Sequence, residues 1–100
     1  MSYKKSYEPA VCADGFTVSI QGAERNYCSP RNNTGPYSSV ELGYPSASDS
    51  LILEFAEDKT DPTGTVYGWV PSHIVLELLE KHGGWVGGEL PPMVIESDVP

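Results

Sequence analysis

The sequence is poor in the residues from which metal sites and disulfide scaffolds are built. It has two cysteines in 100 residues, Cys12 and Cys28, and no CxxC pair. Neither a zinc site nor a disulfide framework is therefore indicated, although a single bridge between the two cysteines is left open. The two histidines, His73 and His82, are nine positions apart in one predicted helix, so they point to opposite sides and cannot share a metal ion. We expect neither a metal site nor any cofactor.

Long hydrophobic runs are also missing. No apolar run approaches the roughly 20 residues that a helix needs to cross a bilayer. The N-terminal stretch MSYKKSYEP lacks the apolar core of a secretory signal peptide. We therefore expect a cytoplasmic protein that has no membrane partner.

Basic residues are scarce. Six Lys and Arg stand against 14 Asp and Glu, which gives a net charge of −8. Residues 1–40 carry four bases and three acids, a net of +1, whereas residues 41–100 carry two bases and eleven acids, a net of −9. Such a surface repels the phosphates of nucleic acids and membranes and favours basic protein partners. The alternative is that the acidity only keeps the protein soluble.

What the sequence does contain is a clear strand and helix between residues 65 and 84. Residues 65–70 are rich in β-branched and aromatic residues, which predicts a strand. Pro71 ends the strand, and Ser72 is the predicted N-cap of a helix. Residues 74–81 then place their apolar side chains on one wide arc and their charged ones on a narrow arc, as an amphipathic helix does. The pair Gly83-Gly84 predicts the end of the helix.

Two more strands and another helix are predicted upstream. Residues 16–21 and 37–44 alternate apolar and polar side chains, with Phe16, Val18 and Ile20 inward in the first and Val40, Leu42 and Tyr44 on one face of the second. We expect these two strands to pair antiparallel. Residues 46–49 have the form of a helix-capping box, and residues 51–58 repeat the apolar pattern of residues 74–81, which favours a first helix. The run 51–55 leaves a buried strand as the alternative.

The predicted fold is therefore a small α+β domain of order β-β-α-β-α. Its sheet has three or four mostly antiparallel strands, with two helices packed on one face. Residues 93–96 are the candidate for a short edge strand. We divide the chain into a flexible N-terminal arm (1–10), a single α+β domain (11–88) and a C-terminal tail (89–100).

Two aromatic side chains of the strand at residues 65–70 are candidate binding residues. We expect Val66 and Val70 to face the helices, which would place Tyr67 and Trp69 together on the other face as a recognition surface. Gly68 between them suits close approach by another backbone or ring. The alternative is that the C-terminal tail, with Trp85 and Pro92, folds over the two rings.

Other candidate binding residues lie in an acidic edge and in a long loop. The acidic edge could be a solvated face, a divalent-cation site or a DNA mimic that acts as a decoy for a basic groove; its segment DKTDPTG lacks the ligand spacing of a calcium loop. The loop at residues 22–36 is long enough to be functional. The candidates in the edge are Glu54, Glu57, Asp58 and Asp61, and those in the loop are Arg25, Tyr27 and Arg31.

No catalytic residues are predicted. His82 is expected to be a packed or capping imidazole that the helix C-terminus favours. A catalytic pair of Cys28 with His73 or His82 is an open alternative, but no local signature supports it. We therefore do not expect an enzyme.

Two segments, NYCSPRNNTGPYSSVELGYPS (residues 26–46) and VYGWVPSHIVLELLEKHGG (residues 66–84), resemble sequences of small acidic proteins of bacteriophages and prophages. Among such proteins are the anti-CRISPR proteins, which are non-enzymatic and block a nucleoprotein complex by occupying a DNA-contacting or recruitment surface. The resemblance implies an inhibitor that acts in the bacterial host cell on a basic host protein or nucleoprotein complex, without binding nucleic acid directly. The alternative is a phage structural or assembly component that acts through self-association. We expect a monomer or a weak homodimer.

Overall fold

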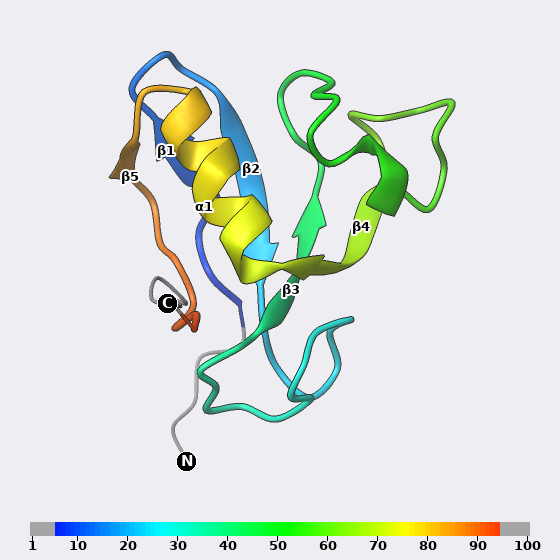
Figure 1. Cartoon of the computed structure of the whole chain (residues 1–100), viewed down its shortest axis with the longest axis vertical. Helices are drawn as coiled ribbons and strands as arrows, with labels where there is room; N and C mark the ends of the chain where they lie inside the picture. Colours follow the sequence, from blue (N-terminus) through cyan, green and yellow to red (C-terminus); the bar gives the residue numbers. More distant parts are fainter. Residues whose placement is uncertain (1–5, 95–100) are drawn as a thin grey trace, which may run out of the picture.

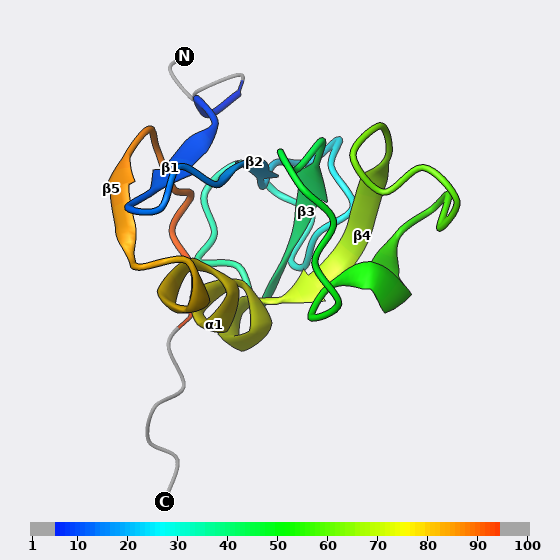
Figure 2. The same cartoon turned by 90° about the horizontal axis from the view of Figure 1, so that it is seen from above.

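The computed structural model describes residues 6–94, in which a curved sheet wraps around one helix (Figures 1 and 2). Seen from above, the strands form an arc, and the helix lies on the concave side of that arc (Figure 2). In chain order the elements are β1 (Ala10–Cys12), β2 (Thr17–Gln21), β3 (Ser39–Gly43), the 3-10 turn η1 (Leu53–Phe55), β4 (Val66–Pro71), α1 (Ser72–Lys81) and β5 (Trp85–Gly87).

The five strands are ordered β4-β3-β2-β1-β5 in one sheet, and every neighbouring pair is antiparallel. The edge strands β4 and β5 are joined through α1, which follows β4 directly (Figure 1). The core fills the space between the sheet and α1. Its buried apolar residues are Ala10, Cys12, Phe16, Val18, Ile20, Cys28, Tyr37, Val40, Leu42, Ile52, Ala56, Tyr67, Val70, Val75, Leu78 and Leu79.

The predicted fold is wrong in its number of strands, its number of helices and their order. The sheet has five strands rather than three or four, and residues 6–94 contain one α-helix rather than two. The missed strands, β1 and β5, have three residues each, and they pair with each other at one end of the sheet. Segments this short carry too few residues for an alternating pattern, so only their long-range pairing defines them.

The predicted strands at residues 16–21 and 37–44 are present as β2 and β3, and they pair antiparallel as expected. The left-handed turn at Gly15 (φ 96°) leads into β2, and its inward residues are buried as the alternation predicted. Tyr44 is an exception to the prediction for β3. The strand ends at Gly43, and Tyr44 adopts a φ of 50° that turns its ring outward, where it is 60% exposed.

The strand and helix predicted between residues 65 and 84 are confirmed as β4 and α1. Gly83 and Gly84 have φ values of 95° and 100°, and they end the helix as predicted. The Gly84 N–H donates to the Leu79 carbonyl and the Gly83 N–H to the Glu80 carbonyl, which is the hydrogen-bond pattern of a Schellman motif. The predicted cap at Ser72 is wrong. Its hydroxyl is buried and donates to the Tyr37 carbonyl at 2.7 Å, which ties α1 to the sheet.

The predicted first helix at residues 51–58 is wrong, and so is the alternative of a strand at residues 51–55. Only η1 forms there, and Ala56 is already extended, with φ −67° and ψ 137°. Ala56 forms a bridge with Tyr67, and Ile52 is buried in the core. Pairing with β4 thus overrides a helical pattern that is too short to be stable alone.

The residues after β5 pack against Tyr37. The Tyr37 N–H donates to the Pro92 carbonyl, and the Val94 N–H donates to the Tyr37 carbonyl. Met93 forms a single parallel bridge with Tyr37 rather than part of a described strand. Residues 95 and 96 of the predicted edge strand lie outside the described residues.

Candidate functional site

A β-bulge in β4 turns Trp69 out of the sheet. Two residues of β4, Gly68 and Trp69, lie opposite a single residue of β3, Glu41. Trp69 has a φ of 49°, a left-handed conformation that is uncommon for a residue with a side chain. Trp69 is 48% exposed. Surrounding structure has to hold such a residue in place, and such residues cluster at functional sites.

Because of this bulge, the predicted alternation along β4 is wrong. Tyr67 is buried in the core on the same side as Val70, and its hydroxyl donates to the Pro62 carbonyl at 2.6 Å. Burial raises the pKa of Tyr67. Tyr67 is thus a core residue, and among the two aromatic candidates of β4 only Trp69 is exposed.

The exposed Trp69 ring stacks on Tyr27 from the long loop between β2 and β3. The ring centroids are 4.7 Å apart and the planes differ by 18°. The backbone N–H of Trp69 also donates to the backbone carbonyl of Tyr27 at 3.0 Å. The Arg31 guanidinium lies 5.9 Å from the centre of the Tyr27 ring, within the range of a cation–π contact. We call Tyr27, Arg31 and Trp69 the aromatic platform.

Gly68 lies close to the Tyr27 side chain, as the sequence predicted for a position that suits close approach by a ring. A Cβ atom at Gly68 would lie 3.4 Å from Cβ and Cδ2 of Tyr27. Arg25 is exposed in the same loop. Trp85 is exposed on β5, at the opposite edge of the sheet, and Pro92 packs near Tyr37. The C-terminal tail therefore does not cover Trp69 in the described part of the chain.

Glu41 holds the loop that carries Tyr27. Its Oε1 atom accepts hydrogen bonds from Asn26 Nδ2 at 2.8 Å and from the Tyr27 N–H at 3.2 Å. The same side chain lines a pocket of about 230 Å³ on the outer face of β2 and β3, which we call the Glu41 pocket. The residues that line the Glu41 pocket are Ser19, Gln21, Asn26, Glu41, Leu42, Gly43, Tyr44 and Val66. The sequence did not predict this pocket, and its one signal there is an acidic residue in the middle of a predicted strand.

The four acidic candidates lie along the segment that leads from η1 toward β4. Glu54, Glu57, Asp58 and Asp61 are all exposed. The Glu57 N–H donates to the Val66 carbonyl at 3.0 Å, so this segment runs beside the first half of β4, whereas Trp69 lies in the second half. Hydrogen bonds from the Thr60 hydroxyl and N–H lower the pKa of Asp58, which keeps this carboxylate charged.

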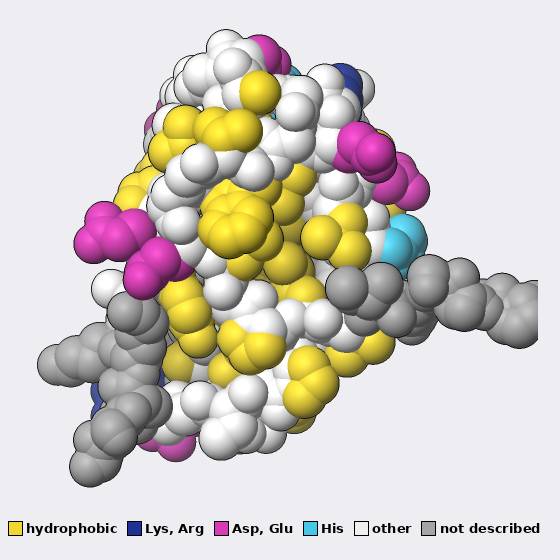
Figure 3. Space-filling model, turned by 90° about the vertical axis from the view of Figure 1, so that its left-hand side faces the viewer, with side chains coloured by type: hydrophobic (Ala, Val, Ile, Leu, Met, Phe, Trp, Pro, Cys, Tyr) yellow, Lys and Arg dark blue, Asp and Glu magenta, His cyan; other side chains and the backbone are white. Residues whose placement is uncertain are grey.

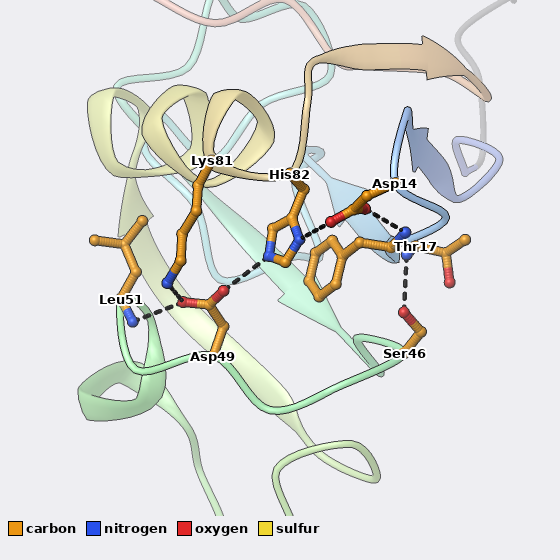
Figure 4. Close-up of polar contacts among 8 residues, drawn as sticks. Asp14, Thr17, Ser46, Asp49, Leu51, Lys81 and His82 are labelled. Carbon is orange, nitrogen blue, oxygen red and sulfur yellow. Dashed lines mark hydrogen bonds and ion pairs between the residues drawn. The ribbon is translucent and has the colours of Figure 1, made fainter.

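His82 lies between two carboxylates (Figure 4). Its Nδ1 is 2.7 Å from Asp14 Oδ2, and its Nε2 is 2.8 Å from Asp49 Oδ2. Since an ionised carboxylate only accepts hydrogen bonds, the ring can donate to both carboxylates only when both of its nitrogens carry a proton, so this arrangement favours the imidazolium form. Burial opposes this charge, but the hydrogen bonds to Asp14 and Asp49 outweigh it and raise the pKa of His82. The ring also stacks on Phe16, with centroids 3.9 Å apart. The prediction of a packed imidazole is confirmed.

Asp49 joins this histidine to α1 and to the turn that precedes η1. Its side chain is only 4% exposed, and it also accepts hydrogen bonds from Lys81 Nζ at 2.8 Å and from the Leu51 N–H at 2.9 Å (Figure 4). Burial disfavours the charged carboxylate, yet these bonds and the one from His82 lower the pKa of Asp49. We call Asp14, Asp49, Lys81 and His82 the charged network. The charged network connects distant chain segments, and each of its ionic groups is paired with another member.

The two cysteines are both free and buried. The Cys28 thiol donates to the Ala23 carbonyl at 3.2 Å rather than to a histidine. His73 is exposed on α1. Within residues 6–94 no group of three or more His, Cys, Asp or Glu residues is placed to hold a metal ion. No helix in the same range is long and apolar enough to cross a membrane.

The aromatic platform and the Glu41 pocket are the features with the clearest capacity to bind a partner. Three of the predicted binding residues, Tyr27, Arg31 and Trp69, come together, and the four acids adjoin the same edge strand. Comparisons of the chain with protein-family models, with curated proteins and with solved structures found no match.

Proposed function

We propose that this protein is a non-enzymatic inhibitor from a phage or prophage, similar in role to the anti-CRISPR proteins, that binds a basic surface of a host defence complex. The observation that supports this most is the aromatic platform. Trp, Tyr and Arg are the residue types that most often carry the binding energy of a protein interface. Here their arrangement is fixed in advance by the β-bulge and by Glu41, which reduces the entropy that binding has to remove.

The charge of the β4 edge supports a basic partner. The exposed acids Glu54, Glu57, Asp58 and Asp61 lie beside one half of β4, and the platform lies on the other half. Acids in this position attract a Lys- and Arg-rich surface during encounter, while the rings supply contact area after docking. A blocked basic groove could no longer bind or recruit nucleic acid, which is how such an inhibitor acts.

The contacts of the candidate catalytic groups support a role without chemistry. Both ring nitrogens of His82 are bound to carboxylates, so the ring has no free base to accept a proton. The Cys28 thiol is buried and bonded to a backbone carbonyl, whereas a reactive cysteine needs an accessible thiolate.

The test begins with the purified protein as bait in a lysate of the bacterial host, with captured proteins identified by mass spectrometry. Affinity for the captured partner is then measured by calorimetry with Trp69→Ala and with Trp85→Ala as the matched control, since both tryptophans are 48% exposed. We expect Trp69→Ala to weaken binding by about tenfold or more, or about 1.4 kcal/mol, and Trp85→Ala to leave it unchanged. Equal affinities of the two variants would contradict the proposed surface.

The acidic segment is tested by reversing Glu54, Glu57 and Asp58 to lysine together. We expect weaker binding and a smaller dependence on salt, because fewer ion pairs are screened. Glu77 and Glu80, exposed on α1, are the controls and are reversed in a second variant. If the first variant binds as the wild type does, the acids do not take part in recognition.

A second candidate function, assembly through self-association, is favoured by the exposed edge at β5. Trp85 and Val86 are both exposed on this strand, whose outer backbone groups are unpaired within the described sheet. Hydrophobic side chains gather on this side of the molecule, with acidic side chains at the margins (Figure 3). Exposed edges of this kind promote pairing between copies. Light scattering over a range of concentrations separates the candidates: an oligomer that Trp85→Ala dissociates favours assembly, and a constant monomer favours the inhibitor.

A further inference from the structure

The Glu41 pocket has the size and the chemistry of a site for one basic side chain. Its volume of about 230 Å³ is below the roughly 300–1,000 Å³ of pockets that enclose whole small-molecule ligands. Its lining contains one carboxylate and no basic residue, and Tyr44 is one of the lining residues. From these features we propose that the Glu41 pocket binds the guanidinium group of an arginine of the partner protein. This inference rests on the proposed function, because it names the anchor of the basic partner.

The hydrogen bonds of Glu41 leave one of its oxygens for a ligand. Both bonds from the loop, those of Asn26 and Tyr27, end on Oε1. Within residues 6–94 no protein group donates a hydrogen bond to Oε2, although the side chain is half-buried. A guanidinium presents several N–H donors in a plane and pairs well with such an oxygen. Because this carboxylate is partly shielded from water, the pair is stronger than one on an open surface.

The walls of the pocket suit a planar cation. Tyr44 is held outward by its φ of 50°, so its ring is available for a cation–π contact. Gly43 keeps the space open: a Cβ atom there would lie only 3.6 Å from Val66 Cγ1 and 3.8 Å from Ser19 Cβ. A larger side chain at Gly43 would therefore extend between these two lining residues and occupy part of the pocket.

The pocket and the aromatic platform belong to one surface. Glu41 lies opposite the bulge that carries Trp69, and it bonds directly to the backbone of Tyr27. When a partner packs apolar side chains against the aromatic platform, an arginine next to them on the partner can reach Glu41. The net charge of −8 favours the approach of that cation.

The experiment uses NMR chemical-shift titration of the full chain with three short peptides, acetyl-Gly-Xaa-Gly-amide, in which Xaa is arginine, lysine or citrulline. Citrulline has the shape of arginine without its charge. We expect the arginine peptide to bind with a Kd on the order of millimolar and to shift the amides of Gln21, Asn26 and residues 41–44. We expect weaker shifts with lysine and none with citrulline, because the pair requires a planar cation.

Two variants locate the effect. Glu41→Gln keeps an Oε1 acceptor for Asn26 and Tyr27 but places an NH₂ group in the pocket, so it preserves the loop and is expected to weaken arginine binding at least tenfold. Gly43→Val occupies part of the pocket and is expected to do the same. Glu77→Gln, which removes one exposed charge from α1, is the control and is expected to bind as the wild type does.

Equal shifts with arginine and citrulline, or unchanged binding by Glu41→Gln, would overturn the inference. Neither result bears on the proposed function, since the peptides are tested without the partner. Conversely, a captured partner whose affinity depends on Trp69 but not on Glu41 would support the proposed function and reject the arginine pocket.

Discussion

Replacing Asp49 by alanine tests whether the charged network holds η1, α1 and the β1–β2 turn together. The lost carboxylate accepts three hydrogen bonds, from Lys81 Nζ, His82 Nε2 and the Leu51 N–H, at 2.8, 2.8 and 2.9 Å. The Lys81 side chain is half exposed, so water replaces its bond at a cost of about 0–1 kcal/mol. The bond to His82 is shielded from water and contributes about 1.5–3 kcal/mol, and the backbone bond contributes about 1 kcal/mol.

We therefore expect Asp49→Ala to lower the free energy of unfolding by about 3 kcal/mol. This is a large share of the roughly 5–15 kcal/mol that stabilises a domain, and it corresponds to a fall in melting temperature of roughly 12–24 °C. Urea unfolding followed by tryptophan fluorescence and by circular dichroism measures the change. Glu80→Ala, which removes an exposed carboxylate from α1 next to Lys81, is the control and should change the free energy of unfolding by less than about 0.5 kcal/mol.

The pH dependence of stability gives an independent measure of the same network. The pKa of His82 is raised in the folded protein, so its contribution is complete below the unfolded value of about 6.5 and is lost as the pH rises through the folded pKa. The pKa of Asp49 is lowered, so its contribution is complete above about 3.9 and is lost as the pH falls through the folded pKa. The contribution of this network to wild-type stability should therefore be greatest between about pH 4 and 6.5.

Asp49→Asn removes the charge of the side chain but keeps its shape, so it separates the two effects on stability. Asparagine retains an oxygen for the Leu51 N–H but cannot pair with a protonated His82, so we expect a smaller loss of stability than in Asp49→Ala together with a weaker pH dependence. The charged network does not stabilise the fold if the free energy of unfolding of Asp49→Ala is within about 0.5 kcal/mol of the wild-type value. The same conclusion follows if both variants keep the pH dependence of stability of the wild type.

Two further substitutions test the ends of α1. Gly83→Ala should destabilise the protein by about 1–2 kcal/mol, because φ at Gly83 is 95° and the new Cβ atom would lie 2.9 Å from the Ala13 Cβ. Thermal unfolding measures this change. Gly43→Ala, at a position without positive φ, is the control. Ser72→Ala should lower the free energy of unfolding by about 1 kcal/mol, because the buried hydrogen bond from the Ser72 hydroxyl to the Tyr37 carbonyl is lost, while the bond from the Val94 N–H to that carbonyl remains. A variant as stable as the wild type in urea would show that the Ser72 bond contributes nothing.

Only part of the candidate site could be predicted from the sequence. The loop at residues 22–36 and Trp69 were predicted to bind, and the structure stacks Tyr27 on Trp69. Glu41 and Tyr44 were missed as site residues. Glu41 acquires its role only because the bulge in β4 and the loop before β3 meet at its side chain, and these are contacts between residues far apart in the chain.

The sequence by itself determined β2, β3 and the unit of β4 and α1. In these segments the apolar period, Pro71 and the Gly83-Gly84 stop act over a few residues, and local preference agrees with the tertiary structure. The tertiary structure alone decided that residues 51–58 form only η1, that β1 and β5 pair, and that Trp69 faces outward while Tyr67 is buried. Each of these outcomes depends on pairing with β4, β3 or β1 across the sheet, and the free energy of that pairing exceeds the weak preference of a short segment.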